Sequence, residues 1–211
     1  MPSIIQTDTL KDGSGTKTLA EYSSSAWGWG SGCPAGTVIQ LLQSYKGDRD
    51  SVAGSAQSDG TNANNFAFIP GQGSDAVFQQ AITTTGSNKV LITHHGNYGC
   101  SAKDFTLMIQ LFRGSASDTA IGSCTKLGAG DDVGNSLQTQ SNILIQTTNS
   151  GGMRSVSFSF LDSPGAGTHY YKLAWLGESG ATHYINRTGG DGNLAYQAST
   201  ASSLNVLEVQ V

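Results

Sequence analysis

The segment Ser155–Phe160 alternates strictly between small polar and apolar residues. In an extended chain Val156, Phe158 and Phe160 point to one side, and the serines between them point to the other. Alternation of this kind is typical of a β-strand that is buried on one face. The segment therefore predicts a half-buried strand.

Further strand-like runs recur along the chain, each bounded by turn-forming residues. They span Thr37–Ser44, Val77–Ile82, Lys89–His95, Phe105–Phe112, Tyr170–Leu176, Thr182–Asn186 and Leu204–Val211, with weaker runs at Ala120–Gly122 and Asn142–Gln146. Their spacing lies near the roughly 8–12 residues expected of a sandwich. No window carries a sustained apolar stripe of helical period, so we expect almost no α-helix. We predict an all-β fold, an antiparallel β-sandwich of the jelly-roll kind.

The final run, Leu204–Val211, differs because apolar residues fall on both of its sides. Leu204 and Val206 lie on one side, and Leu207 and Val209 lie on the other. Both faces of this strand are therefore expected to be covered. One cover is the sandwich core. The other is either a second subunit or a further part of a thick monomer.

The first 33 residues differ in character from the rest. Glycine and serine dominate Ser23–Pro34, which indicates a linker without regular structure. Trp27 and Trp29 lie within it, and large apolar rings in such a stretch indicate a partner surface that buries them. A short strand is expected at Ser3–Gln6. We interpret residues 1–33 as an extended N-terminal docking arm and residues 34–211 as the sandwich domain.

The composition suits short strands joined by many turns. Only 12% of the 211 residues are charged, and the chain contains 28 glycines. Glycine supplies positive-φ turn positions and costs about 1 kcal/mol relative to alanine inside a helix. The net charge of −4 opposes nucleic-acid binding, which needs a basic surface.

Targeting and redox features indicate a protein made in the cytoplasm. No apolar run approaches the roughly 18 residues of a membrane span, and the start lacks the features of a secretory signal. Cys33, Cys100 and Cys124 are odd in number and irregularly spaced, so we expect reduced, mostly buried thiols. The glycosylation sequon at Asn186–Thr188 has no expected role without a secretory signal.

The chain shows no recognisable catalytic motif. Asp48, Asp50 and the pair Asp131-Asp132 lie in turn-like stretches, where aspartate usually bonds its own backbone. Gly177–Gly180 lacks the spacing of a hydrolase nucleophile elbow, and no phosphate-binding glycine loop is present. We therefore expect no enzymatic activity and no catalytic residues.

Two features offer metal ligands. Because His94 and His95 are adjacent on a predicted strand, their rings point to opposite faces and do not readily chelate one ion. We expect one ring to be hydrogen-bonded toward the core and the other to point outward. A metal on an oligomer axis is the alternative. Asp131-Asp132 and Asp191–Asn193 supply oxygen ligands without an EF-hand pattern, so calcium is an alternative to the predicted absence of cofactors.

Aromatic residues near strand ends suggest sugar binding. Tyr98, Trp175, Tyr184 and Tyr196 offer flat rings with polar tips that suit a glycan. The competing interpretation is that Trp175 and its neighbours form the core. The loop Leu127–Gly134 is a further candidate, because loop tips on rigid sandwiches often carry recognition. The pattern does not single out receptor-binding residues.

Residues 34–211 resemble a family of structural proteins from marine bacteriophages, notably tail-fibre and virion proteins. The resemblance rests on an ordered series of phrases, Pro34–Gln40, Thr85–Ile92, Phe112–Gly114, Phe160–Pro164, Tyr170–Lys172, Tyr184–Arg187 and Leu204–Val209, together with the opening Ile4–Gly15. The sequences Trp27–Gly30 and Lys46–Asn65 depart from the family pattern.

The resemblance implies a jelly-roll module, similar in outline to trimeric TNF-like or C1q-like heads, displayed on a virion assembled in the host cytoplasm. It implies a homotrimer without catalytic residues. Its partners would be other virion proteins, through the arm, and a host surface glycan or protein. The alternatives are a capsid decoration protein, a head fibre or a tail adaptor. A lectin-like module or a glycan hydrolase is a further, weaker alternative.

Overall fold

The computed structural model describes residues 34–54, 66–102, 104–117, 120–129, 152–190 and 199–211. It also describes the backbone of four further strands, β1 (Thr9–Lys11), β2 (Thr18–Ser23), β3 (Ala26–Trp29) and β11 (Ser141–Ile145). Within these parts of the chain the regular structure is almost entirely β, and the one helix is the short 3₁₀ turn η2 (Ile121–Ser123). The prediction of an all-β fold is confirmed.

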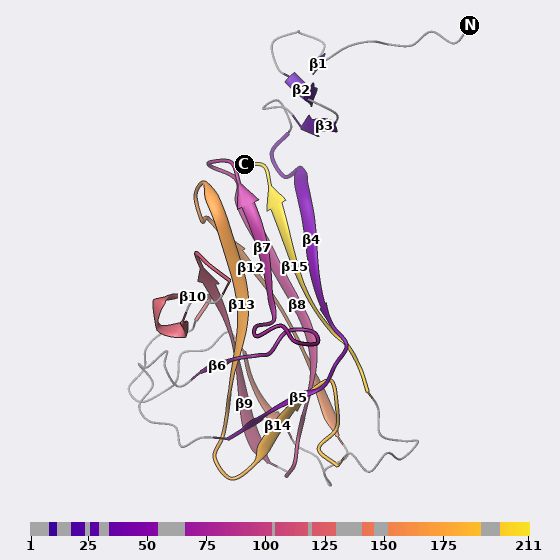
Figure 1. Cartoon of the computed structure of the whole chain (residues 1–211), viewed down its shortest axis with the longest axis vertical. Helices are drawn as coiled ribbons and strands as arrows, with labels where there is room; N and C mark the ends of the chain where they lie inside the picture. The colour runs from indigo at the N-terminus through magenta and orange to yellow at the C-terminus, as the bar shows by residue number, and fades with distance from the viewer. Residues whose placement is uncertain are drawn as a thin grey trace, which may run out of the picture.

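Two antiparallel sheets form a sandwich (Figure 1). The first contains β4 (Val38–Lys46), β15 (Ser202–Val209), β8 (Lys89–Cys100), β12 (Met153–Asp162), β14 (Thr182–Ile185) and β5 (Asp50–Ala53). The second contains β7 (Gln79–Thr84), β13 (Gly167–Gly177), β9 (Phe105–Gly114), β10 (Thr125–Leu127), β6 (Ala67–Phe68) and β11.

The chain crosses repeatedly between the two layers. It passes from β7 in the second sheet to β8 in the first and returns to β9. The same alternation follows from β11 through β12 to β13, and β15 closes the first sheet between β4 and β8. This interleaving of sheets is that of a jelly roll.

Inward-facing apolar side chains of both sheets form the core. Val156 is 3% exposed, Phe158 and Phe160 pack against the core, and the intervening serines are exposed. The alternation read from Ser155–Phe160 is therefore confirmed. In β15, Leu204 and Val206 are fully buried while Leu207 and Val209 face outward and are half-buried.

The outer faces of the two sheets differ. The outer face of the second sheet carries a separate apolar cluster of five buried residues, Phe66, Met108, Phe112, Ala174 and Leu176. Segments of the same chain, including the one that contains Phe66, cover that face. The outer face of the first sheet instead leaves large apolar side chains in solvent, including Leu41 and Tyr45 at 60% and Leu161 at 51% exposure.

Several details differ from the predictions. Ala120–Gly122 contributes to η2 rather than to a strand, because its backbone turns back so that the N–H of Ser123 reaches the carbonyl of Ala120. The short strands β5, β6 and β10 were not predicted. Their two to four residues are too few for an alternation to stand out.

The predicted linker Ser23–Pro34 contains strand β3, which pairs with β2 in a separate three-stranded antiparallel sheet. Ladder pairing with β2, such as Trp27 opposite Tyr22, supplies the backbone hydrogen bonds that composition alone does not suggest. The predicted strand Ser3–Gln6 lies outside the described residues. The docking role of residues 1–33 stays a prediction.

Candidate functional site

Four leucines form one straight row across the outer face of the first sheet. Leu207 of β15 lies opposite Leu41 of β4 on one side and Leu91 of β8 on the other. Leu161 of β12 lies opposite Leu91 and completes the row. Leu41 and Leu161 are more than half exposed, and Leu91 and Leu207 are half-buried. The row is an apolar stripe without a cover from the described chain.

On one side of this leucine row, the next two rows are polar and carry no formal charge. The next row is Gln43, Asn205, Thr93 and Ser159, and the one beyond it is Tyr45, Ser203, His95 and Ser157. Asn205 accepts a hydrogen bond from the Gln43 amide at 2.6 Å and donates one to the Thr93 hydroxyl at 3.1 Å. Hydrogen bonds among these side chains partly preorganise this part of the face. The row on the other side of the leucines holds Val38, Val209 and Lys89, and Lys89 adds one positive charge.

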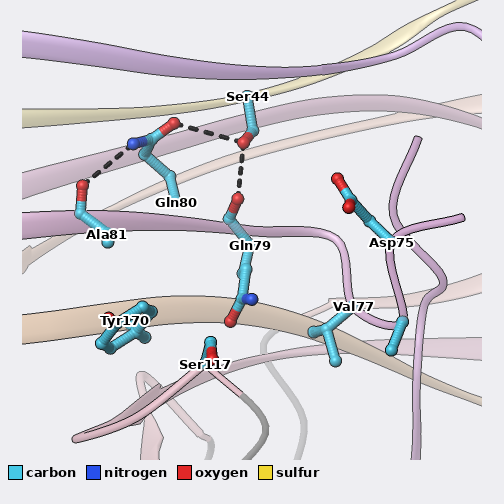
Figure 2. A pocket seen from close by; sticks show the side chains of 9 residues that line it. Ser44, Asp75, Val77, Gln79, Gln80, Ala81, Ser117 and Tyr170 are labelled. Atoms are coloured by element: carbon cyan, nitrogen blue, oxygen red, sulfur yellow. Dashed lines mark hydrogen bonds between the residues drawn. The ribbon is translucent and has the colours of Figure 1, made fainter. Parts of the chain in front are cut away.

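A second feature is an open cleft of about 450 Å³ at the edge of the sandwich where β4 approaches β7 and β13 (Figure 2). Its lining is Ser44, Asp75, Ala76, Val77, Gln79, Gln80, Ala81, Ser117 and Tyr170. The Ser44 hydroxyl donates to the carbonyl oxygen of Gln79 at 2.5 Å and lies 3.2 Å from the Gln80 side-chain oxygen. Side chains of β4 therefore hold the free edge of β7 in place.

The amide of Gln79 is the unusual group in this cleft. Its Oε1 atom is buried and accepts no hydrogen bond from the described residues. In Figure 2 the side chain points from β7 toward Ser117 and β13. Across from it, the half-buried Tyr170 ring has the ammonium of Lys172 5.9 Å from its centroid. The cleft thus combines an unfilled acceptor with an aromatic wall.

The histidine pair behaves as predicted. His94 is 2% exposed, and its ring nitrogens lie 2.9 Å from the Ser203 carbonyl oxygen and 2.9 Å from the Tyr98 hydroxyl. Burial lowers the pKa of His94 to about 4, so the ring is neutral at physiological pH. His95 is exposed and bonds the Ser157 hydroxyl. The two rings point to opposite faces of the sheet, so their nitrogens are not placed to bind one ion.

Asp48 and Asp50 do more than bond their own turn. The fully buried Lys46 ammonium lies 2.5 Å from an oxygen of each carboxylate and donates to the Gly71 carbonyl at 2.9 Å. Burial alone would raise the pKa of Asp48, but bonds from Lys46 and the Gly73 N–H lower it below its ordinary value. This ion cluster fixes the β4–β5 turn against the loop at Gly71.

Asn186 joins the same region to β15. Its amide donates to the carbonyls of Lys46 and Asp48, both at 2.9 Å, and its oxygen accepts from Ser202 at 2.7 Å. The side chain is fully buried, so the sequon at Asn186–Thr188 offers no free amide for glycosylation in the folded protein. The sequence pattern did not reveal this structural role.

The predicted sugar-binding aromatics are dispersed. Tyr98 and Trp175 are buried in the core, which confirms the competing interpretation for these two residues. Tyr184 is half-buried, with the Arg187 guanidinium 4.2 Å from its ring centroid. None of these three lines the cleft, and Tyr170, which does, was not singled out.

Other candidates lie partly or wholly outside the described residues. Tyr196, Asp131-Asp132 and Asp191–Asn193 are outside, and of the loop Leu127–Gly134 only the first residues are described. Cys33 is outside as well, whereas Cys100 is buried and Cys124 half-buried, both as free thiols whose pKa burial raises.

In the described part of the chain, no three histidine, cysteine, aspartate or glutamate residues gather as metal ligands would. The same residues include no helix long and apolar enough to cross a membrane.

Comparison with protein-family models and with curated proteins finds no match. Among solved structures, the Eiger TNF of S. frugiperda is similar at 13% identity and a TM-score of 0.38, over 80% of this chain and 92% of that one. A structure of infectious bursal disease virus, Gx strain, is similar at 10% identity and a TM-score of 0.32, over 92% of this chain and 43% of that one. Similarity this remote carries no functional argument, and the fold assignment rests on the sheets described above.

Proposed function

We propose that this chain is a non-enzymatic bacteriophage virion protein, a tail-fibre or host-attachment module that works as a homotrimer. The observation that carries the oligomeric part is the leucine row Leu41, Leu207, Leu91 and Leu161 on the uncovered face of the first sheet. The virion role and the number of copies are carried by the resemblance of residues 34–211 to phage structural proteins.

A second copy of this chain is the partner that this face fits. The leucine row and the two polar rows on one side of it carry no formal charge, so copies of these rows do not repel one another around a threefold axis, and the Lys89 ammonium lies in the row on the other side. Leu41 lies on β4, an edge strand of its sheet, and closing against another subunit also protects such an edge. Burial of exposed leucines between chains supplies the main favourable term.

The test of the assembly is the mass of the full chain in solution, measured by light scattering on a sizing column. We expect about three times the chain mass of 21.9 kDa. Leu41→Glu and Leu161→Glu should each shift the mass toward one chain, because a buried carboxylate at the interface lacks a partner. Both leucines are more than half exposed in one chain, so its fold tolerates the change.

The matched control places a glutamate on the second sheet, away from the leucine row. Thr83 is an exposed residue of β7, and Thr83→Glu should leave the mass unchanged. Circular dichroism checks that each variant is folded. A wild-type protein that runs as one chain at all concentrations, or a Leu41→Glu variant that keeps the wild-type mass, would overturn the homotrimer.

The virion role is tested on the particle itself. Mass spectrometry of purified particles of the encoding phage should detect the chain, and immunogold labelling should place it on the tail. Labelling on the head would favour a capsid decoration protein or head fibre. Absence from the particle contradicts the proposal. Incubation with host polysaccharide should give binding without depolymerisation, and cleavage would contradict the non-enzymatic role.

A further inference from the structure

We propose that the cleft in Figure 2 binds a neutral sugar residue of a host surface glycan. The biological meaning of this site rests on the attachment function proposed above, whereas its chemistry rests on the lining residues alone. It lies at the β4, β7 and β13 edge, and its aromatic wall is Tyr170 rather than any residue of the sequence-predicted set.

The first argument is the unfilled acceptor. A buried carbonyl oxygen without a donor costs free energy, so such atoms in a folded protein need an explanation. Gln79 Oε1 is in this state, and it belongs to a residue that lines the cleft. The atom itself has almost no surface open to solvent, so a ligand hydroxyl reaches it when the Gln79 side chain turns toward the cleft, and the new hydrogen bond then removes the cost. Gln79 is therefore an acceptor that a bound ligand can satisfy.

The second argument is the aromatic wall. Tyr170 is half-buried beside Ala81, its partner across the β7–β13 ladder. A flat ring with a polar tip stacks on the C–H face of a sugar while its hydroxyl bonds to the ligand. Because Tyr170 and Gln79 both come from paired strands, the spacing between ring and acceptor is rigid.

The third argument is charge, which decides among ligand classes. Of the nine described residues that line the cleft, Asp75 alone carries a formal charge, and this negative charge disfavours anions such as phosphates and acidic sugars. A cationic ligand is opposed by the ammonium of Lys172 beside Tyr170, which is held by the carbonyls of Ala116 and Ser117. A neutral ligand with several hydroxyl donors fits both constraints.

The fourth argument is size. The volume of about 450 Å³ falls in the range of roughly 300–1,000 Å³ that small-molecule sites occupy. The cleft is open to solvent along one side, which suits a terminal residue of a longer chain that continues outside the site.

The test is saturation-transfer NMR on the full chain, with glucose, galactose, mannose, rhamnose and N-acetylglucosamine at millimolar concentration as the probes. We expect transfer to at least one sugar. Gln79→Leu should weaken its binding about tenfold or more while leaving the melting temperature unchanged or higher, because an unsatisfied buried acceptor is removed. If Gln79 had only a structural role, Gln79→Leu would change the melting temperature together with sugar binding.

Tyr170 supplies the second set of variants. Tyr170→Ala should abolish the transfer signal, whereas Tyr170→Phe retains the ring and should keep most of it. The matched control is Tyr184→Ala, which removes a tyrosine that stacks on Arg187 outside the cleft. Binding should survive in this control.

Each result decides the proposal. Absence of transfer to all five sugars, or binding that survives both Gln79→Leu and Tyr170→Ala, overturns the sugar site. Loss of binding in Tyr184→Ala alone also overturns it, by moving the site elsewhere. Light scattering on the same samples keeps the two proposals separate. A single-chain protein that binds sugar contradicts only the homotrimer, and a trimer that binds none contradicts only the cleft.

Discussion

The imidazole of His94 lies 2.9 Å from the hydroxyl of Tyr98 inside the sandwich, although the next residue, His95, is exposed on the opposite face. Phe78 and Phe158 also contact the His94 ring, with centroids 6.3 Å and 5.2 Å away. The core therefore holds a neutral histidine that accepts a proton only at a cost.

The first prediction is a loss of stability in mild acid. Burial lowers the pKa of His94 from an ordinary 6.5 to about 4, so below pH 6.5 the unfolded chain binds a proton that the folded chain excludes. Stability should fall as the pH drops from 6.5 toward 4, by up to about 3 kcal/mol from this group. Urea unfolding at fixed protein concentration measures it.

Two variants isolate this contribution from the carboxylates that titrate in the same range. His94→Gln should be less stable at pH 7 but show a shallower loss between pH 6.5 and 4. His95→Gln changes an exposed neighbour and should keep the wild-type slope. Equal slopes in all three proteins would show that His94 does not control acid stability.

The second prediction concerns the ion cluster at the β4–β5 turn. Lys46→Met removes the ammonium that lies 2.5 Å from both Asp48 and Asp50, and it leaves the Gly71 carbonyl without its donor. Breaking a buried pair costs about 3–5 kcal/mol, and the carboxylates here are about one-third exposed, so we expect about 2–3 kcal/mol.

A double-mutant cycle with Asp50→Asn checks this cluster. Removing one carboxylate relieves the repulsion that Lys46→Met leaves behind, so the double variant should be more stable than the sum of the single changes predicts. Strictly additive losses would mean that Lys46 and Asp50 do not interact in solution.

The strands that could be predicted are those in which the alternation of apolar and polar residues matches the alternation of buried and exposed side chains. In β12, each apolar residue of Ser155–Phe160 turns inward, and in β15 both the inner Leu204 and the outer Leu207 were placed on the correct sides. The short β6 could not be found in this way, because its two residues pair with Ala174 and Trp175 only once β13 is in place.

The leucine row and the cleft depend on tertiary register, which the linear pattern does not contain. Leu41 and Leu207 are far apart in the chain and become neighbours only through the β4–β15 pairing. The cleft likewise brings together Ser44, Gln79 and Tyr170 from three strands, and Ser44 bonds the Gln79 carbonyl there. Only the outward apolar side of β15 gave a sequence-level signal.

The third prediction separates backbone from side-chain effects at Asn186. This residue has φ +63°, in the left-handed region, and its amide bonds two carbonyls of the β4–β5 turn. Asn186→Ala loses the bonds and is strained, whereas Asn186→Gly loses the bonds without strain. Both should be destabilised, with the glycine variant more stable than the alanine variant by about 1 kcal/mol.

Asp104 is the control for this comparison, because it is exposed and has a similar φ of +61°. The Asp104→Gly variant should also have a free energy of unfolding about 1 kcal/mol higher than Asp104→Ala. Both variants should lose much less stability than the corresponding variants at Asn186. Equal losses of unfolding free energy at the two positions would show that the buried amide of Asn186 contributes no stability.

The fourth prediction concerns the buried carboxylate that joins the two sheets. Asp162 of β12 lies 2.5 Å from the Arg113 guanidinium of β9 and accepts a bond from the Tyr171 hydroxyl of β13 at 2.8 Å. Burial above all, and then the Asp162 carboxylate, raise the pKa of Tyr171, so the hydroxyl stays a donor. Tyr171→Phe should therefore cost about 1.5–3 kcal/mol, the value of a hydrogen bond to a charged group.

The neighbouring tyrosine provides the matched comparison. Tyr170 points to the other face of β13, away from Asp162, and Tyr170→Phe should change the unfolding free energy by less than about 0.5 kcal/mol. Urea unfolding of both variants at one protein concentration measures this difference. Each substitution removes only a hydroxyl and keeps the ring, so the comparison isolates the hydrogen bond. A Tyr171→Phe protein as stable as Tyr170→Phe would mean that Arg113 alone satisfies Asp162 and that the phenol adds no stability to the link between the sheets.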